Sequence, residues 1–180
     1  GYALPIQSYE ELARDIAEYI VPLLHAKYTI KESDGKVQSQ RSSSLYELLK
    51  HMADRHWHTT ETHGCDYHTE SLLVHSFCAA IAAYMTAKAV RKSPCPDWLV
   101  FVMGLFHDCG KPAALSESKI NDTTSYKGHD LAGAMLLLRA IDAATLNGVS
   151  AQQWEWVCRA VEQHMCCLHT PVLPEHCRAF

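Results

Sequence analysis

Several features that would assign this 180-residue chain to a particular class of protein are missing from it. It has no run of about 18 uncharged apolar residues that would predict a membrane span, no internal repeat and no signal peptide. Its eight cysteines lie mostly in helical patterns and include no Cys-x-x-Cys pair, so a zinc knuckle is not expected. We therefore expect a cytoplasmic protein whose thiols stay reduced.

The chain also lacks an excess of positive charge. It has 16 Lys and Arg against 20 Asp and Glu, which gives a formal net charge of −4. That balance argues against an extensive nucleic-acid surface but leaves room for a local basic pocket. With 48% hydrophobic residues, a chain of this length buries about two-thirds or more of its unfolded surface in one core. We expect one domain over 1–180, and its start at Gly1 rather than Met fits a domain excised from a longer protein.

Apolar residues recur with helical spacing along most of the chain, which predicts an all-α fold. Capping-box signatures indicate helix starts at Ser8, Ser44 and Ser150. The first of these helices is expected to kink at Pro22. Residues 31–43 are polar and rich in serine, and they are predicted to form a loop.

A His-Asp pair follows the most apolar segment of the chain. Residues 97–106 are apolar all round after Asp97 as N-cap, which predicts a helix buried on every side, and Gly110 is the residue type that often follows a helix end. Because a buried carboxylate is costly without a partner, a positive group is expected beside Asp108, most simply a divalent cation. In the alternative interpretation Asp108 caps a neighbouring helix and His107 bonds a backbone carbonyl.

Three further histidines lie in helical segments. His75 is in the apolar stretch 69–85 and is expected in the interior. His129 opens a segment whose small residues at 132–134 let a neighbouring helix approach closely, and His164 ends an amphipathic stretch. Each of them taken singly is typical of a core or helix-terminal histidine. Together with the His-Asp pair they indicate a metal site.

The order of these residues resembles the HD superfamily of metal-dependent phosphohydrolases, with His75 as the first histidine and His107-Asp108 as the name-giving pair. The closer likeness is to the HD domains of some tRNA nucleotidyltransferases and RNA-end-healing enzymes. It covers about Tyr67 to His169 and depends on three runs: His107-Asp108-Cys109-Gly110-Lys111-Pro112, Gly128-His129-Asp130-Leu131-Ala132-Gly133-Ala134 and Val161-Glu162-Gln163-His164-Met165. The resemblance implies a compact, all-α HD-domain helical bundle.

The metal ligands that the resemblance implies are His75, His107 and Asp108 for a first ion, with His129 and His164 holding a second ion or contacting a substrate phosphate. Many HD proteins add an Asp well after the third histidine, but no Asp follows Asp142 here. Three alternatives remain: the two later histidines replace it, the missing ligand lies beyond Phe180, or the site binds one metal loosely.

The ligand types point to a class of metal and of chemistry. Imidazole with carboxylate suits Mn, Fe, Co, Ni or Zn better than Mg or Ca. Asp108 would ligate the ion, and would bridge two ions if both are bound. Lys111 either neutralises a phosphate oxygen of the substrate or is a helix C-terminal cation favoured by the helix dipole. Lys127, beside His129, has the same two alternatives, and the polar segment 115–127 is expected to border the site.

A second group of histidines lies upstream, near Trp57 and Cys65: His51, His56, His58, His63 and His68. A separate zinc site is one interpretation, but the spacing fits no familiar ligand pattern and the flanks are polar, which favours a solvated loop. His68, seven residues before His75, is the member expected to reach the active site, where it would contact substrate.

These features predict a metal-dependent phosphohydrolase that acts on a nucleotide or an RNA terminal phosphate, such as a 2′,3′-cyclic phosphate or a phosphomonoester. The choice of substrate rests on the resemblance. One alternative is a non-catalytic RNA-binding or regulatory HD module of a larger RNA-processing enzyme, which the missing late Asp supports. Another is an HD-type di-iron oxygenase.

Overall fold

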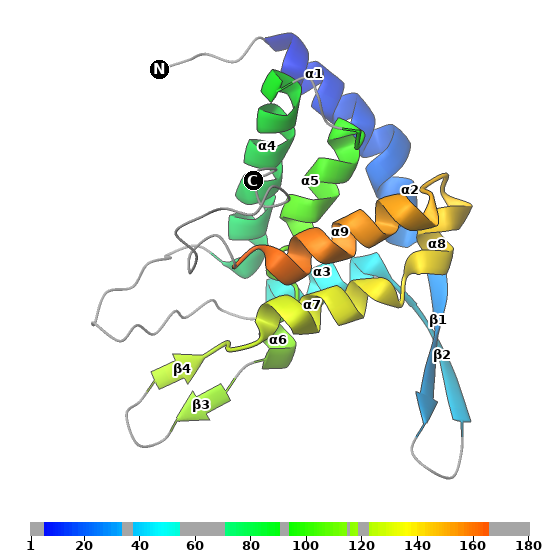
Figure 1. The fold of residues 1–180 in the computed structure, drawn as a ribbon, viewed down its shortest axis with the longest axis vertical. Coiled ribbons are helices and arrows are strands. Elements are labelled where there is room, and N and C mark those ends of the chain that lie inside the picture. The colour runs from blue at the N-terminus through cyan, green and yellow to red at the C-terminus, as the bar shows by residue number, and fades with distance from the viewer. Residues whose placement is uncertain are drawn as a thin grey trace.

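The computed structural model describes residues 6–33, 38–54, 71–90, 94–114, 116–118 and 123–165. These residues form a mostly helical fold, which confirms the predicted fold class (Figure 1). The helical segments are α1 (Ile6–Asp15), the π-helical η1 (Ile16–Ile20), α2 (Val21–His25), α3 (Leu45–Asp54), α4 (Leu72–Val90), α5 (Asp97–Phe106), α6 (Lys111–Ala114), α7 (His129–Leu138), α8 (Ile141–Leu146) and α9 (Ala151–Gln163). Two antiparallel hairpins join β1 (Lys27–Ser33) to β2 (Gln38–Ser44) and β3 (Ser116–Ser118) to β4 (Thr123–Ser125).

The hairpin of β1 and β2 corrects the prediction of a loop over 31–43. Lys27 pairs with Ser44 at one end of the ladder, and Ser33 pairs with Gln38 at the other. Along β1 the side chains alternate, with Tyr28 buried in the core, as is Ile30 two residues later. An alternation this short is hard to recognise in a serine-rich sequence, because the second strand adds little apolar pattern of its own.

The first helical run also differs from its prediction. Ser8 lies inside α1 rather than at its start, so the predicted capping box is wrong. The irregularity expected at Pro22 is present, but it begins earlier, in η1, where the Val21 N–H donates to the Ile16 carbonyl five residues back. A proline ring clashes with the carbonyl four residues before it, and the wider π-helical turn gives that carbonyl room.

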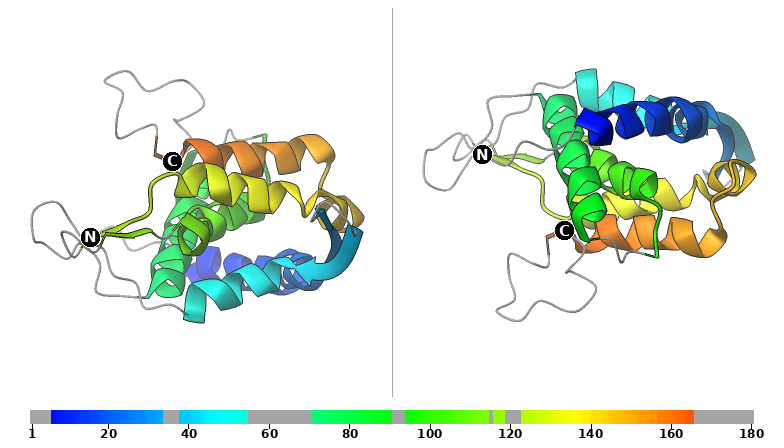
Figure 2. Two further views of the ribbon diagram at one scale, coloured as in Figure 1. Left: turned by 90° about the horizontal axis from the view of Figure 1, so that it is seen from below. Right: turned by 90° about the horizontal axis from the view of Figure 1, so that it is seen from above.

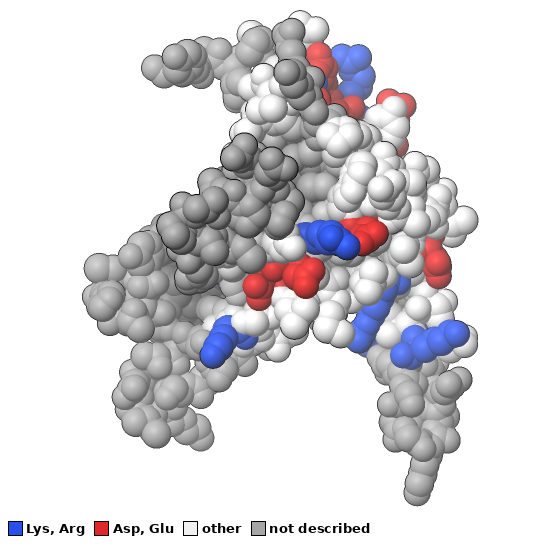
Figure 3. All heavy atoms as spheres, viewed as in Figure 1, with Lys and Arg blue, Asp and Glu red and all other residues white. Residues whose placement is uncertain are grey.

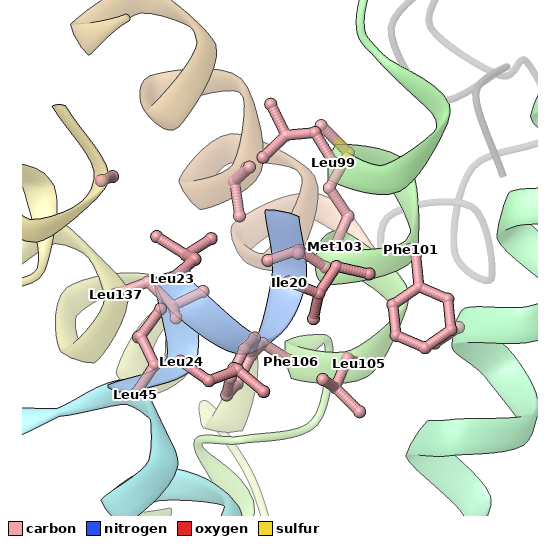
Figure 4. Close-up of a cluster of buried hydrophobic side chains, with 14 of the residues drawn as sticks. Ile20, Leu23, Leu24, Leu45, Leu99, Phe101, Met103, Leu105, Phe106 and Leu137 are labelled. Carbon is pink, nitrogen blue, oxygen red and sulfur yellow. The ribbon is translucent and has the colours of Figure 1, made fainter. Parts of the chain in front are cut away.

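Helix α5 lies in the middle of the fold. Every residue from Leu99 to Phe106 is buried, as its apolar pattern predicted, although Asp97 is the first helical residue and Pro96 holds the N-cap position. Seen from below, α7 and α9 lie on one side of α5 and α1 to α3 on the other (Figure 2). Figure 4 shows the α5 side chains meeting Ile20 and its neighbours from the first helical run. The core therefore fixes where α5 ends, and with it the His-Asp pair.

Helix α4 packs along α5 at very short range. A Cβ atom added at Gly104 would lie 2.7 Å from the Ala80 Cα atom. Among the described residues α4 is the one helix long and apolar enough to cross a membrane, with 22% of its most apolar window buried. Core helices of soluble proteins meet the same criterion, so this is weak evidence for a membrane span. What α4 does in the fold is bring His75, in its first turn, to the end of α5.

Polar contacts join α4 and α5 to α1 at the opposite end of the two helices. The Lys88 ammonium pairs with Glu11 and lies 3.4 Å from Asp97, and the Tyr84 hydroxyl donates to Asp15 at 2.8 Å. These contacts hold three helices together at one end and so limit how far α4 and α5 can slide past each other at the other end.

Candidate metal centre

The five residues predicted as metal ligands meet at one place in the fold. It lies where the start of α4, the end of α5, the start of α7 and the end of α9 come together (Figure 1). His75 is in the first turn of α4, His107 and Asp108 follow α5, His129 is the first residue of α7 and His164 follows α9. Segments almost 90 residues apart in sequence thus contribute to one cluster.

Asp108 is the centre of this cluster. Only 3% of the residue is exposed, and each of its carboxylate oxygens faces two histidines. Oδ1 lies 3.1 Å from His129 Nε2 and 3.4 Å from His164 Nε2. Oδ2 lies 3.2 Å from His107 Nε2 and 3.5 Å from His75 Nε2. Every imidazole therefore presents the same nitrogen, Nε2, to the carboxylate.

The backbone sets the orientation of three of these rings. Each lies with Nδ1 against a backbone carbonyl: His107 on Gly104 at 2.7 Å, His129 on Tyr126 at 2.8 Å and His164 on Val161 at 2.6 Å. Because a carbonyl oxygen only accepts hydrogen bonds, Nδ1 carries the proton and donates it. In the neutral imidazole Nε2 is then a free lone pair, which is the form that binds a metal ion.

Asp108 Oδ1, His129 Nε2 and His164 Nε2 form a triangle, and each of these three atoms has a lone pair. His129 Nε2 and His164 Nε2 are 3.1 Å apart, and each is within 3.4 Å of Oδ1. Three facing lone pairs repel one another unless a cation lies between them. Ligand atoms about 2.1 Å from an ion are about 3.0 Å apart at a right angle and about 3.4 Å apart at the tetrahedral angle. The three separations therefore fit a bound metal ion.

All five residues fit a metal ion in two overlapping sets that share Asp108. The first set is His75, His107 and Asp108, and the second is Asp108, His129 and His164. No described cysteine belongs to either set. The prediction that these residues can hold a metal ion is confirmed by this geometry.

The charges of the cluster favour an ionised carboxylate. Burial alone would raise the pKa of Asp108, but the contacts with His107, His129 and His164, which donate to the carboxylate when Nε2 carries a proton, outweigh burial and hold that pKa well below its usual range. For His107 burial alone would lower the pKa, but the contact with Asp108 outweighs it and the pKa is raised above 6.5. Burial lowers the pKa of Lys111, with Asp108 acting in the opposite direction.

For an ion held by His75, His107 and Asp108, affinity is expected to fall on acidification, because that ion needs a neutral His107. The raised pKa of His107 means that protons begin to compete above pH 6.5. Affinity should then fall about tenfold per pH unit below that pKa. Asp108 stays ionised over the same range, since its pKa is lowered. Calorimetric titration with Mn²⁺ or Zn²⁺ between about pH 6 and pH 8 measures this slope.

The metal-free chain is the control for that titration, because His107 affects its stability with the opposite sign. A raised folded-state pKa contributes stability that is fully present below the unfolded value and is lost as the pH rises through the folded value. The contribution of Asp108 is constant above its unfolded pKa of about 3.9. If the affinity of the position formed by His75, His107 and Asp108 does not depend on pH, His107 is not a ligand there.

Lys111 lies beside the carboxylate. It is the first residue of α6, and its Nζ atom is 2.9 Å from Asp108 Oδ2 and 5.8 Å from the centre of the Tyr126 ring. The prediction of a positive group beside Asp108 is therefore confirmed by Lys111. Lys127 is exposed in the turn before α7.

The upstream histidine cluster is mostly outside the described residues. His51 is exposed in α3, whereas His56, His58, His63 and His68 lie outside the described ranges. The predicted substrate contact of His68 and the choice between zinc site and loop stay predictions. The segment 115–127 does border the site, as predicted, through the Tyr126 carbonyl and ring.

Gly110 has a different role from the predicted one. The described glycines with positive φ are Gly128 and Gly148, so Gly110 is not needed for a left-handed helix end. Instead, a Cβ atom at Gly110 would overlap the His129 carbonyl oxygen and the Gly133 nitrogen. The close approach predicted from the small residues at 132–134 is confirmed, and it presses the start of α7 against the segment that carries Asp108.

Three of the four described cysteines are buried, as predicted, and one is not. Cys95, Cys109 and Cys158 are buried, whereas Cys78 is exposed on α4. Burial raises the pKa of Cys95 to about 12 and that of Cys158 to about 11. The buried thiols are therefore poor nucleophiles and poor metal ligands at neutral pH.

Comparison with known proteins found no family model that matches the chain, and no curated protein or solved structure that matches it significantly. The resemblance to HD domains therefore stays a prediction that depends on the motifs. Metal binding is inferred from the geometry of the cluster alone.

Proposed function

We propose that this protein is a metal-dependent phosphohydrolase that acts on a nucleotide or an RNA terminal phosphate. The observation that supports the proposal most is the convergence of four imidazole Nε2 atoms on one buried carboxylate, with an ammonium group beside it. The cluster offers ligands for a metal ion, and the Lys111 ammonium lies beside the same carboxylate. Both positive charges would attract a phosphate group.

The metal proposed is a divalent transition ion: Mn, Fe, Co, Ni or Zn. Four of the five candidate ligands are imidazoles, which these ions accept and which Mg²⁺ and Ca²⁺ bind poorly. Such an ion, when bound, lowers the pKa of a water molecule and polarises a phosphoryl oxygen. One or two ions per site are compatible with the two overlapping ligand sets.

The residues of the chain have separate roles in this proposal. Asp108 supplies the one carboxylate of the cluster and would hold the ion together with the histidines, three of whose rings are fixed by backbone carbonyls. The Lys111 ammonium lies on the same carboxylate and is placed to neutralise a phosphate oxygen. Asp108 and Lys111 are thus the residues proposed to act in catalysis, with Lys127 a more distant candidate for substrate contact.

The distribution of Lys and Arg side chains on the surface indicates how much of a nucleic acid the protein would contact. On the face shown in Figure 3, the Lys and Arg side chains of the described residues lie apart from one another, with Asp and Glu among them. A dispersed pattern of this kind favours recognition of one terminal phosphate over binding along an extended nucleic-acid backbone.

Reconstitution of the metal-depleted chain tests the proposal. Mn, Fe, Co, Ni, Zn and Mg ions are supplied in turn, and hydrolysis of 2′,3′-cyclic nucleotides, nucleoside monophosphates and RNA with a terminal phosphate is followed by chromatography. We expect turnover with at least one transition ion, little with Mg²⁺ and none in the metal-free control.

Two other results would replace this proposal with an alternative. Tight RNA binding without hydrolysis of any substrate would favour the non-catalytic module. Oxygen consumption by the iron-loaded chain together with a mixed-valence iron signal would favour the di-iron oxygenase.

A further inference from the structure

The two oxygens of Asp108 have different surroundings. Oδ1 faces His129 and His164, whereas Oδ2 faces His75, His107 and also the Lys111 ammonium at 2.9 Å. At the candidate metal position formed by His75, His107 and Asp108, the carboxylate oxygen Oδ2 therefore already contacts the Lys111 ammonium.

Distances and burial favour the Oδ1 position for a tightly bound ion. All three ligand separations there lie between 3.1 and 3.4 Å, and both imidazoles are held by backbone carbonyls. The side chains of His129 and His164 are 9% and 10% exposed, against 22% for His75 and 16% for His107. The Oδ1 side is therefore better shielded from water.

Charge acts in the same direction. Asp108 is the one carboxylate in the two ligand sets, and the Lys111 ammonium already balances it. One divalent ion then leaves the centre with two positive charges, which a phosphomonoester dianion neutralises. Among the described residues the two ligand sets hold no second carboxylate, so a second divalent ion would add its charge directly beside the Lys111 ammonium on an almost completely buried carboxylate, which is unfavourable.

We propose that Lys111 takes the place of a second metal ion. The centre binds one divalent ion tightly, through Asp108 Oδ1, His129 and His164, and the ammonium on Oδ2 keeps the position beside His75 and His107 from binding another tightly. This deepens the proposed function, on whose metal centre it rests. The more exposed position beside Lys111 is where the substrate phosphate binds, between the ion and the ammonium.

Metal stoichiometry tests the proposal without an activity assay. The chain is loaded with Mn²⁺ and desalted, bound metal is measured by mass spectrometry, and affinities are measured by calorimetry. We expect one tight ion per chain in the wild type, its retention in His75→Ala and its loss in His129→Ala. Lys111→Met should raise the affinity for a second ion on the order of 100-fold, because a charge next to that ion is removed.

Lys127→Met is the matched control, since it removes a lysine outside the cluster and should leave the stoichiometry at one. Electron paramagnetic resonance should show an isolated Mn²⁺ in the wild type and a coupled pair in Lys111→Met.

Three outcomes overturn the proposal: two tight ions in the wild type, loss of the ion in His75→Ala with retention in His129→Ala, or no second ion in folded Lys111→Met. If Lys111→Met does not fold, as circular dichroism would show, the wild-type stoichiometry and the two histidine variants still decide. A chain that binds one ion but hydrolyses no substrate leaves this inference standing and rejects only the hydrolase.

Discussion

Replacing Asp108 with Ala is expected to abolish metal binding and to lower metal-dependent kcat/KM by about 1000-fold or more, since the variant removes a group on which all other catalytic parts depend. The carboxylate contacts all four histidines and Lys111, so no other described side chain can replace it. Calorimetry and the hydrolysis assay measure the two effects separately. Asp142→Ala, at an exposed position of α8, is the control and should change neither.

The same variant should also be less stable, which must be separated from its loss of activity. Without Asp108 the mostly buried Lys111 ammonium loses this carboxylate, and breaking a buried ion pair costs about 3–5 kcal/mol. The double variant Asp108→Ala with Lys111→Met removes both charges and should regain part of that stability while remaining inactive. Full activity in Asp108→Ala would contradict the assignment of the centre.

Replacing Gly110 with Ala is expected to destabilise the protein by about 3 kcal/mol or more, because the added methyl group cannot be accommodated by a side-chain shift. It would overlap backbone atoms of His129 and Gly133, so α7 must move away from the segment that carries Asp108. For a domain of this size the melting temperature should fall by roughly 6–12 °C. Since His129 moves with α7, metal affinity should fall as well.

Gly148→Ala separates this packing effect from the general cost of replacing a glycine. Gly148 has φ of +82° and nothing near its Cβ position, so Ala there costs only the left-handed conformation, about 1–2 kcal/mol, and leaves metal affinity unchanged. Equal melting temperatures for the wild type and Gly110→Ala would mean that α7 does not pack against Gly110 as described.

Features that depend on one continuous segment could be predicted from the sequence. The burial of α5 follows from its unbroken apolar composition, and the start of α9 follows from the Ser150 capping box. In that box the Gln153 N–H donates to the Ser150 hydroxyl at 3.1 Å, and the Ser150 N–H donates to the Gln153 side chain at 3.0 Å. The local periodicity also placed His129 and His164 at helix ends.

Features that depend on contact between segments could not be derived in this way. A glycine after an apolar helix predicts an ordinary helix end, but Gly110 is needed because α7 approaches its Cα atom closely. The sequence around Gly110 does not indicate this contact. The hairpin of β1 and β2 depends on a pairing partner that is almost entirely polar. The Lys111 pair with Asp108 is local, three residues apart, but its consequence for metal binding appears only when the four histidines are placed around it.

Anomalous X-ray diffraction from crystals of the chain loaded with Mn²⁺ or Zn²⁺ tests most directly whether Asp108 and the histidines form a metal centre. Such a centre should give a strong peak about 2.0–2.3 Å from Asp108 Oδ1, His129 Nε2 and His164 Nε2. A fully loaded crystal with no peak within ligand distance of Asp108, or with the ion bound elsewhere on the chain, would contradict it.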